Sequence, residues 1–271
     1  MQPLTPYRFA ASLAVGFLLL GLVGACASSG VNQGDLNVVS VQEEWELGRK
    51  LETDLARKLD LVRDRQLAGY VSRVGQAVVR QTEMANLPWK FHVVRSPEVN
   101  AFNIPGGHVY VNTGLIVAAD SASELAGVMA HEISHGVARH GTEQLTRAYG
   151  LNILGALLLG ENPAVYEQIL AQIVGTGSLA KFSRNNEREA DTLGVRYMAG
   201  AGYHPEGLAR MFEELLERRR GRPSSVQQFF SSHPLTEDRV EAVRSMAASM
   251  STAGLKRDEP GFQQAQRRAG G

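Results

Sequence analysis

Val128-Met-Ala-His131-Glu132-Ile-Ser-His135-Gly-Val-Ala-Arg-His140 is the stretch on which the interpretation of the whole chain depends. Two histidines four residues apart on an α-helix lie one turn above each other, where a single divalent ion can bind both imidazoles. Glu132 follows the first histidine, so it can lie beside the ion and take a proton from a water bound there. Random order would give this pattern roughly 0.01 times in such a chain, so the spacing predicts a zinc site.

The flanking residues indicate that this helix is buried. Ser121 and Glu124 have the spacing of a capping box at its start, and Gly141 is expected to end it. A histidine or glutamate inside a buried helix is costly unless a metal compensates it, which disfavours a surface helix that happens to carry two histidines. The apolar positions are too broadly spread for a solvated helix: Leu125, Val128, Met129, Ile133 and Val137.

A zinc site needs a third protein ligand and an open position for water. The helical pattern of residues 185–198 carries Glu187 and Asp191 four positions apart on one face. Glu187 can bind zinc, and Asp191 can hold a ligand histidine through its other ring nitrogen. Glu189 lies two residues from Glu187 and is expected to point elsewhere.

The other histidines are assigned structural positions. His140 follows His135 by five residues, which rotates it off the metal-binding face of a continuous helix, so it is interpreted as a C-terminal helix residue favoured by the dipole. His92 and His108 are placed on strands, and His204 precedes a framework helix.

Residues 89–94 and 100–114 predict a small antiparallel sheet beside the metal-binding helix. The first segment alternates like a strand, and the second has a strand, turn, strand pattern with the turn at Pro105-Gly-Gly107. In zinc peptidases, an edge strand next to the metal helix commonly pairs with substrate backbone, and one of these strands is a candidate for that role. The alternative is an ordinary hairpin.

Helical patterns account for most of the remaining chain, at residues 41–61, 66–84, 206–218 and 237–250. Residues 151–160 are mostly apolar but too few to span a membrane. They form either a buried helix or a lid that touches a bilayer surface. We therefore expect a mainly helical α+β domain over residues 41–250, followed by a mobile tail at 251–271.

The N-terminus has the features of a bacterial export signal. A charge-free run ends at Cys26, which is the only cysteine. Leu22-Val-Gly-Ala-Cys26 resembles a lipobox, so residues 1–25 are interpreted as a lipoprotein-type signal peptide and Cys26 as a lipidated membrane anchor. The alternative is an uncleaved anchor, although a span needs about 20 apolar residues. Residues 26–40 are expected to form a flexible tether, and Ala27 favours the outer membrane over the inner one, facing the periplasm.

Charge and cysteine content narrow the possible partners. With 28 basic and 28 acidic residues, the chain has no net field to recruit nucleic acid. A single cysteine also rules out an intramolecular disulfide. The expected partners are instead a membrane, through the lipidated Cys26, and polypeptides, which the candidate edge strand favours.

Four motifs together resemble the family 48 metallopeptidases. The resemblance spans residues 40–250 and implies a gluzincin (zincin-like) fold and endopeptidase activity, often in quality control of the cell envelope. The absence of an internal membrane span makes the chain similar to the periplasmic and lipoprotein members, and we expect no tetratricopeptide repeats. The motifs are His131-Glu-x-x-His135, Asn100-Ala-Phe-x-x-Pro-Gly-Gly107, Glu187-x-x-Ala-Asp191 and Ser232-His-Pro-Leu-Thr-Glu-Asp-Arg239.

His233 is interpreted through this resemblance. Without it, His233 is a loop histidine before Pro234, where Thr236 caps the next helix. The resemblance implies that His233 faces the zinc and either covers the open position or donates to the oxyanion of the tetrahedral intermediate. Arg239 is a weaker candidate for a charge partner in the same site.

The sequence thus predicts a zinc endopeptidase that acts on misfolded or misassembled envelope proteins. Two alternatives are a metal-stabilised chaperone or assembly factor and a zinc hydrolase of a non-protein envelope substrate; the intact Glu132 favours an enzyme. One Zn²⁺ would be bound by His131, His135 and Glu187, with Glu132, Asp191 and His233 as the catalytic residues.

Overall fold

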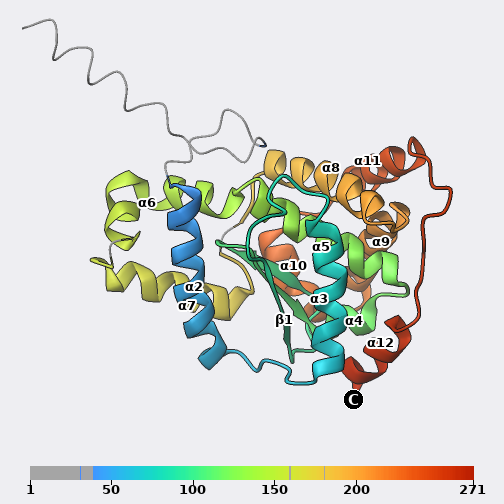
Figure 1. Cartoon of the computed structure of the whole chain (residues 1–271), viewed down its shortest axis with the longest axis horizontal. Coiled ribbons are helices and arrows are strands. Elements are labelled where there is room, and N and C mark those ends of the chain that lie inside the picture. Colours follow the sequence, from blue (N-terminus) through green and yellow to red (C-terminus); the bar gives the residue numbers. More distant parts are fainter. Residues whose placement is uncertain (1–30, 32–38, 159, 180) are drawn as a thin grey trace, which may run out of the picture.

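The computed structural model describes residues 31, 39–158, 160–179 and 181–271, which are mostly helical (Figure 1). The predicted signal peptide, Cys26 and most of the tether lie outside these residues. Each expected helix has a counterpart whose ends differ by a few residues. The helices are α2 (Val41–Lys58), α3 (Arg65–Val79), α4 (Thr113–Ala118), α5 (Ala122–Val137), α6 (His140–Leu158), α7 (Pro163–Thr176), α8 (Arg184–Gly200), α9 (Glu206–Gly221), α10 (Gln227–Ser232), α11 (Glu237–Ala248) and α12 (Phe262–Gly270), with a 3₁₀ turn η1 at Pro223–Val226.

The described residues form one three-stranded sheet of β1 (Lys90–Val94), β2 (Ala101–Ile104) and β3 (His108–Asn112), in the order β1-β3-β2. The mainly helical α+β fold is confirmed, but the sheet is mixed rather than antiparallel. β2 and β3 form the expected hairpin, whereas β1 pairs with β3 in parallel. The chain reverses after β1 and again at Gly106-Gly107, where both residues have positive φ, so β3 runs in the direction of β1.

The two faces of the sheet pack against different helices (Figure 1). Odd-numbered strand residues such as Phe91 and Val109 join a core with α3 and α5. Even-numbered residues such as Ile104 and Tyr110 join a second core with α2, α6 and α7. Helix α5, with the paired histidines, and helix α2 therefore cover opposite faces of the sheet.

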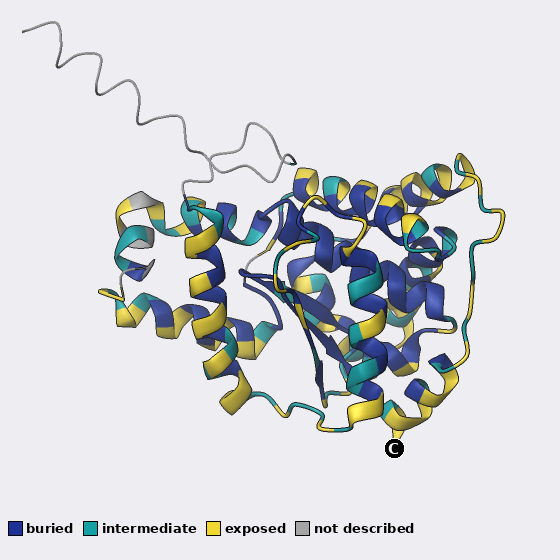
Figure 2. Ribbon diagram, in the orientation of Figure 1, coloured by how far each residue is buried: buried dark blue, intermediate teal, exposed yellow. Residues whose placement is uncertain are grey.

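Helix α5 is buried along its whole length, as the dark ribbon in Figure 2 shows. At its start the Ser121 hydroxyl accepts a hydrogen bond from the backbone N–H of Glu124. The Glu124 carboxylate in turn accepts from the backbone N–H of Asp120 at 2.7 Å. Both bonds satisfy N–H groups at or beside the helix start, which would otherwise lose hydrogen bonds in a buried position.

A left-handed turn separates α5 from α6. The expected helix end at Gly141 is wrong, because Arg139 has a φ of 60° and breaks the helix after Val137. The Arg139 guanidinium donates to Glu44 of α2 at 2.7 Å and to the carbonyl of Val39 at 2.5 Å. Helix α5 thus ends at Val137, and α6 begins at His140.

The C-terminal segment is not the mobile tail that its lack of periodicity predicts. Phe262 begins α12, is 1% exposed and packs near Tyr70, with ring centroids 6.4 Å apart. Ala265 is buried beside it, and Gln266 donates to the carbonyl of Ala119 at 2.6 Å. Two buried side chains are too few to produce a periodic pattern, yet they fix this helix against α3 and α4.

The apolar residues 151–160 follow a break inside α6 at Gly150, which has a φ of 74° and a ψ of 168°. Leu157 is buried in the core that α2 shares. Within the described part of the chain, we find no helix whose length and apolar character would let it cross a membrane.

Candidate metal centre

Three side chains converge where α5 crosses α8. His131 and His135 lie one turn apart on α5, with their Nε2 atoms separated by 3.1 Å. Glu187 lies in the first turn of α8. One of its carboxylate oxygens is 3.8 Å from Nε2 of His131, and the other is 3.4 Å from Nε2 of His135. The residues that the sequence groups as ligands therefore lie together.

The close approach of the two helices depends on Gly194. A Cβ atom at this position would lie 3.2 Å from the backbone nitrogen of His131, so a larger side chain would push α8 away from α5. The start of α8 is fixed by a capping box between Ser183 and Asn186. Asn186 also donates to Glu143 of α6 at 3.1 Å. These contacts set the position of Glu187 in the helix's first turn.

Asp191 and Arg239 hold two of these ligands in place. Oδ1 of Asp191 lies 3.0 Å from Nδ1 of His131, the ring nitrogen that points away from Glu187. Arg239 of α11 donates to both carboxylate oxygens of Asp191 at 2.8 Å, and it also donates to Glu187. One guanidinium thus compensates two buried carboxylates, which would be costly to bury without a partner.

His233 reaches the same point from the residue after α10. Its Nδ1 lies 3.0 Å from Oε1 of Glu187 and 3.4 Å from Nε2 of His131. Its Nε2 lies 3.4 Å from Oε1 of Glu132. Ligand atoms of His131, His135, Glu187 and His233 all lie within 4.8 Å of one another.

Glu132 is 1% exposed and lies on the side of α5 that faces β2. Its carboxylate faces the backbone amide of Asn103. Burial raises the pKa of Glu132, and the imidazoles of His233 and His131 offset this only in part. A raised pKa brings a carboxyl group closer to the range in which it can both take up and release a proton.

Glu187 has the opposite electrostatic environment. Burial alone would raise its pKa, but His233, His135 and Arg239 outweigh burial and hold the pKa well below its usual range. Glu187 is therefore kept as a carboxylate, whereas Glu132 is more easily protonated. Such a difference between two nearby carboxyl groups is typical of a ligand beside a proton carrier.

A contact that the sequence does not predict lies behind His135. Nδ1 of His140 is 2.9 Å from Nδ1 of His135, and Nε2 of His140 is 3.3 Å from Oε2 of Glu189. On a continuous helix His140 would face away, but the turn at Arg139 returns its ring to His135. Arginine does not signal a left-handed turn, so no sequence pattern could have revealed this contact.

The centre is covered by protein. His131, His135, Glu187 and His233 are each at most 1% exposed. The ring of Phe182 stacks on His135 with centroids 4.0 Å apart, and its centroid lies 5.3 Å from that of His233. A polypeptide can reach the ligands only after one of these covering side chains moves.

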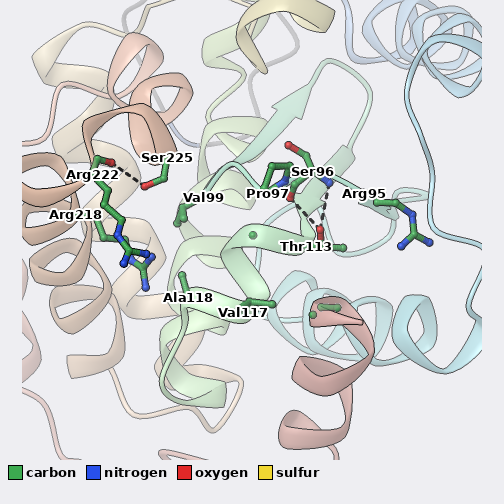
Figure 3. A pocket seen from close by; sticks show the side chains of 13 residues that line it. Arg95, Ser96, Pro97, Val99, Thr113, Val117, Ala118, Arg218, Arg222 and Ser225 are labelled. Carbon is green, nitrogen blue, oxygen red and sulfur yellow. Dashed lines mark hydrogen bonds between the residues drawn. The ribbon is translucent and has the colours of Figure 1, made fainter.

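An open pocket of about 460 Å³ lies elsewhere (Figure 3). Arg218 and Arg222 of the α9 end line one side of it, and Val99, Val117 and Thr113 lie across from them. It shares no lining residue with the covered centre.

The donor set fits Zn²⁺. Imidazole nitrogens and carboxylate oxygens are ordinary zinc ligands, and bonds of about 2.0–2.1 Å place tetrahedral ligands about 3.4 Å apart. The observed separations between the two histidines and Glu187 are 3.1 to 3.8 Å. Nε2 of His233 and Oε1 of Glu132 are buried without a hydrogen-bond partner, an arrangement that an ion or its water would relieve.

A His-Glu-x-x-His helix completed by a glutamate from a later helix defines the class of zinc metallopeptidases. The sequence model of Peptidase family M48 matches residues 65–247, and the chain belongs to this family. The resemblance inferred from the four motifs is therefore confirmed, and with it zinc as the cofactor.

Three relatives show how far the similarity extends. The beta-barrel assembly-enhancing protease of Escherichia coli (strain K12) is 29% identical over 225 residues, covering 79% of this chain and 46% of that protein. A putative beta-barrel assembly-enhancing protease of Vibrio cholerae is 32% identical over 222 residues, covering 78% and 45%. The mitochondrial metalloendopeptidase OMA1 of Schizosaccharomyces pombe is 32% identical over 174 residues, covering 64% and 51%. The chain thus spans about half the length of these relatives.

Proposed function

We propose that this chain is a zinc-dependent endopeptidase in which His131, His135 and Glu187 hold the ion. The observation that carries the proposal is the convergence of these three side chains from two helices, with Glu132 next to them. Zn²⁺ bound at these residues supplies a Lewis acid that polarises a peptide carbonyl and lowers the pKa of water.

Glu132 is the proton carrier in this proposal. It takes a proton from the attacking water and delivers it to the leaving amine. Two observations support this role: burial raises its pKa, and its buried Oε1 has no hydrogen-bond partner. These two properties leave the Glu132 carboxyl group able to accept a proton from the attacking water.

Asp191 and Arg239 position the ligands. Oδ1 of Asp191 lies 3.0 Å from Nδ1 of His131, and in this proposal Nδ1 carries the ring proton, so that the lone pair of Nε2 is left for the metal. Arg239 fixes the Asp191 carboxylate with two hydrogen bonds, so this side chain has little freedom to rotate.

His233 covers the open position in the resting enzyme. The sequence left two roles open, covering the zinc or donating to the oxyanion. The covering role is supported by Nδ1 of His233, which lies within 3.4 Å of atoms of both Glu187 and His131. At that place His233 competes with a substrate carbonyl, so it must swing away for catalysis.

The outer edge of β2, which pairs with no strand among the described residues, is the proposed binding edge for the substrate. The backbone N–H of Asn112 donates to the carbonyl of Asn100 at 3.0 Å, so even-numbered positions of β2 face β3. The odd-numbered Ala101 and Asn103 consequently direct their backbone groups to the other edge, next to Glu132. An extended polypeptide that adds to this edge would pass the proton carrier.

The proposed substrates are misfolded or misassembled proteins of the cell envelope. A lipidated Cys26 would hold the catalytic domain at a membrane, most simply the outer membrane, through the tether of residues 26–40. The names of the Escherichia coli and Vibrio cholerae relatives, which refer to the assembly of β-barrels, support the same compartment.

Digestion of unfolded casein tests the proposal. We expect cleavage that a zinc chelator abolishes, and a loss of at least about 100-fold in Glu132→Gln with the zinc content unchanged. Glu167→Gln, at an exposed carboxylate of α7, is the matched control and should cleave normally. If the protein suppresses casein aggregation without cutting it, the chaperone alternative holds. Loss of zinc from Glu132→Gln would contradict the separation of ligand and proton carrier.

A further inference from the structure

A second group of metal-binding side chains lies on the opposite face of the sheet from α5. Glu52 comes from α2, His92 from β1 and His108 from β3. One ligand atom of each lies within 4.8 Å of those of the other two. None of these residues contributes to the catalytic centre described above.

The parallel pairing of β1 and β3 brings the two histidines together. Lys90 lies opposite His108, and His92 lies opposite Tyr110, so all four side chains share one face. The ring of His92 stacks on that of Tyr110 with centroids 4.6 Å apart and an interplanar angle of 21°. It lies nearly parallel to the ring of His108, at 5.9 Å and 16°. The strands and this stack orient both imidazoles.

Two imidazole nitrogens in this group are buried without a hydrogen-bond partner, Nε2 of His92 and Nδ1 of His108. They lie 3.5 Å and 3.6 Å from the two carboxylate oxygens of Glu52. These separations are long for hydrogen bonds, which cluster near about 2.9–3.0 Å, but they match two ligands around one zinc-sized ion. His108 is 1% exposed, so its unpartnered nitrogen is costly in the absence of a ligand.

We propose that Glu52, His92 and His108 form a second metal site for a divalent ion of the zinc, cobalt or nickel class. Two imidazoles and one carboxylate suit such ions, whereas Mg²⁺ and Ca²⁺ prefer oxygen ligands only. The side chains of Glu52 and His92 are 19% and 17% exposed, so an ion reaches them without passing the covered catalytic centre. A bound ion would link α2 to strands β1 and β3.

Lys90 competes with the ion for Glu52. Its ammonium donates to Oε2 of Glu52 at 2.6 Å, while 52% of the Lys90 side chain is exposed. The ammonium can therefore turn into solvent when an ion takes the carboxylate. Because the two cations share one oxygen, removing the lysine charge should tighten metal binding rather than weaken it.

Metal counting tests the site. The full chain, prepared without a polyhistidine tag, is saturated with Zn²⁺, desalted and analysed by elemental mass spectrometry. We expect two ions per chain in the wild type and one in Glu52→Gln and His108→Asn, both of which should cleave casein normally. His204→Asn, at a histidine in neither group, is the control and should retain two.

A calorimetric titration with Zn²⁺ adds a test that misfolding cannot mimic. Lys90→Gln should bind the second ion roughly two- to fivefold more tightly than the wild type, the range that loss of an exposed ion pair allows. Equal metal content in the saturated wild type and in Glu52→Gln or His108→Asn would overturn the proposal, as would unaltered affinity in Lys90→Gln. Failure of the catalytic proposal would show instead as absent cleavage, with the ion difference between wild type and Glu52→Gln still present.

Discussion

Nδ1 of His140 lies 2.9 Å from Nδ1 of His135, and Nε2 of His140 lies 3.3 Å from the carboxylate of Glu189. His131 is backed in a similar way by Asp191, whose Oδ1 is 3.0 Å from its Nδ1. An acidic group therefore lies behind each histidine of the pair. Asp191 contacts His131 directly, and Glu189 reaches His135 through the imidazole of His140. Such groups fix the ring orientation and the tautomer of a metal ligand.

His140→Ala should lower the affinity for Zn²⁺ by about 10- to 100-fold, because His135 loses the contact that orients its ring. Glu189→Gln should have a smaller effect, since an amide can still accept a hydrogen bond from His140. Competition with a coloured chelator measures both affinities. His204→Ala serves as the control, and equal affinity in His140→Ala and wild type would show that the contact does not position His135.

Arg239 is expected to matter for stability as much as for the site. Arg239→Met would leave Asp191 and Glu187 buried without their common partner, which should lower the free energy of unfolding by about 3–5 kcal/mol. Urea unfolding of the zinc-free protein measures this. Arg57→Met, which removes an exposed ion pair with Asp54, should cost at most about 1 kcal/mol. If both variants lowered the free energy of unfolding by the same small amount, Arg239 would not be the group that compensates the charges of Asp191 and Glu187.

The grouping of the ligands was predictable because it depends on local geometry. A spacing of four residues on a helix fixes His131 relative to His135 and Glu187 relative to Asp191, whatever the rest of the fold does. Their meeting depends on the crossing of α5 and α8, for which the sequence offered only the chemical need for a third ligand. The role of Arg139 lay beyond prediction, because its left-handed turn is held by contacts with Glu44, far away in the chain.

The fold shows the same division between local and distant determinants. Alternation of apolar residues predicts which face of a strand is buried, but not which strands are neighbours, so the parallel pairing of β1 with β3 was missed. Helix α12 was missed because its burial depends mainly on Phe262, which a periodicity argument cannot weigh.

His233→Ala should open the catalytic centre. If His233 covers the metal position, its removal raises the rate of casein cleavage or leaves it unchanged, and it speeds the loss of zinc to a chelator because the ion becomes accessible. Steady-state kinetics and stopped-flow chelation measure the two effects. A turnover rate that is lower by about 100-fold or more, with unchanged chelation, would instead assign His233 to the oxyanion.

The zinc-free protein should show a pH dependence that originates at His233. Burial would lower the pKa of His233, but Glu187 and Glu132 outweigh burial and raise it. A pKa raised by folding stabilises the native state below the unfolded value of about 6.5, and this contribution is lost as the pH rises through the folded value. Urea unfolding of chelator-treated wild type and His233→Gln should therefore give a stability difference that shrinks with rising pH. A stability difference between the two proteins that did not change with pH would show that the titrating charge is not on His233.

Phe262 links the last helix to the catalytic domain. Its ring is 1% exposed and packs near Tyr70 of α3, so Phe262→Ala should leave a cavity and lower the free energy of unfolding by about 3 kcal/mol. Gln263→Ala, at the exposed next position, should change it by less than about 0.5 kcal/mol. Thermal unfolding of the zinc-loaded proteins compares the two. The contacts of α12 are mainly with α3 and α4, and the metal-binding residues lie on other helices. The casein cleavage rate of Phe262→Ala at low temperature should therefore equal that of the wild type. An equal rate would show that the substitution lowers stability without damaging the site.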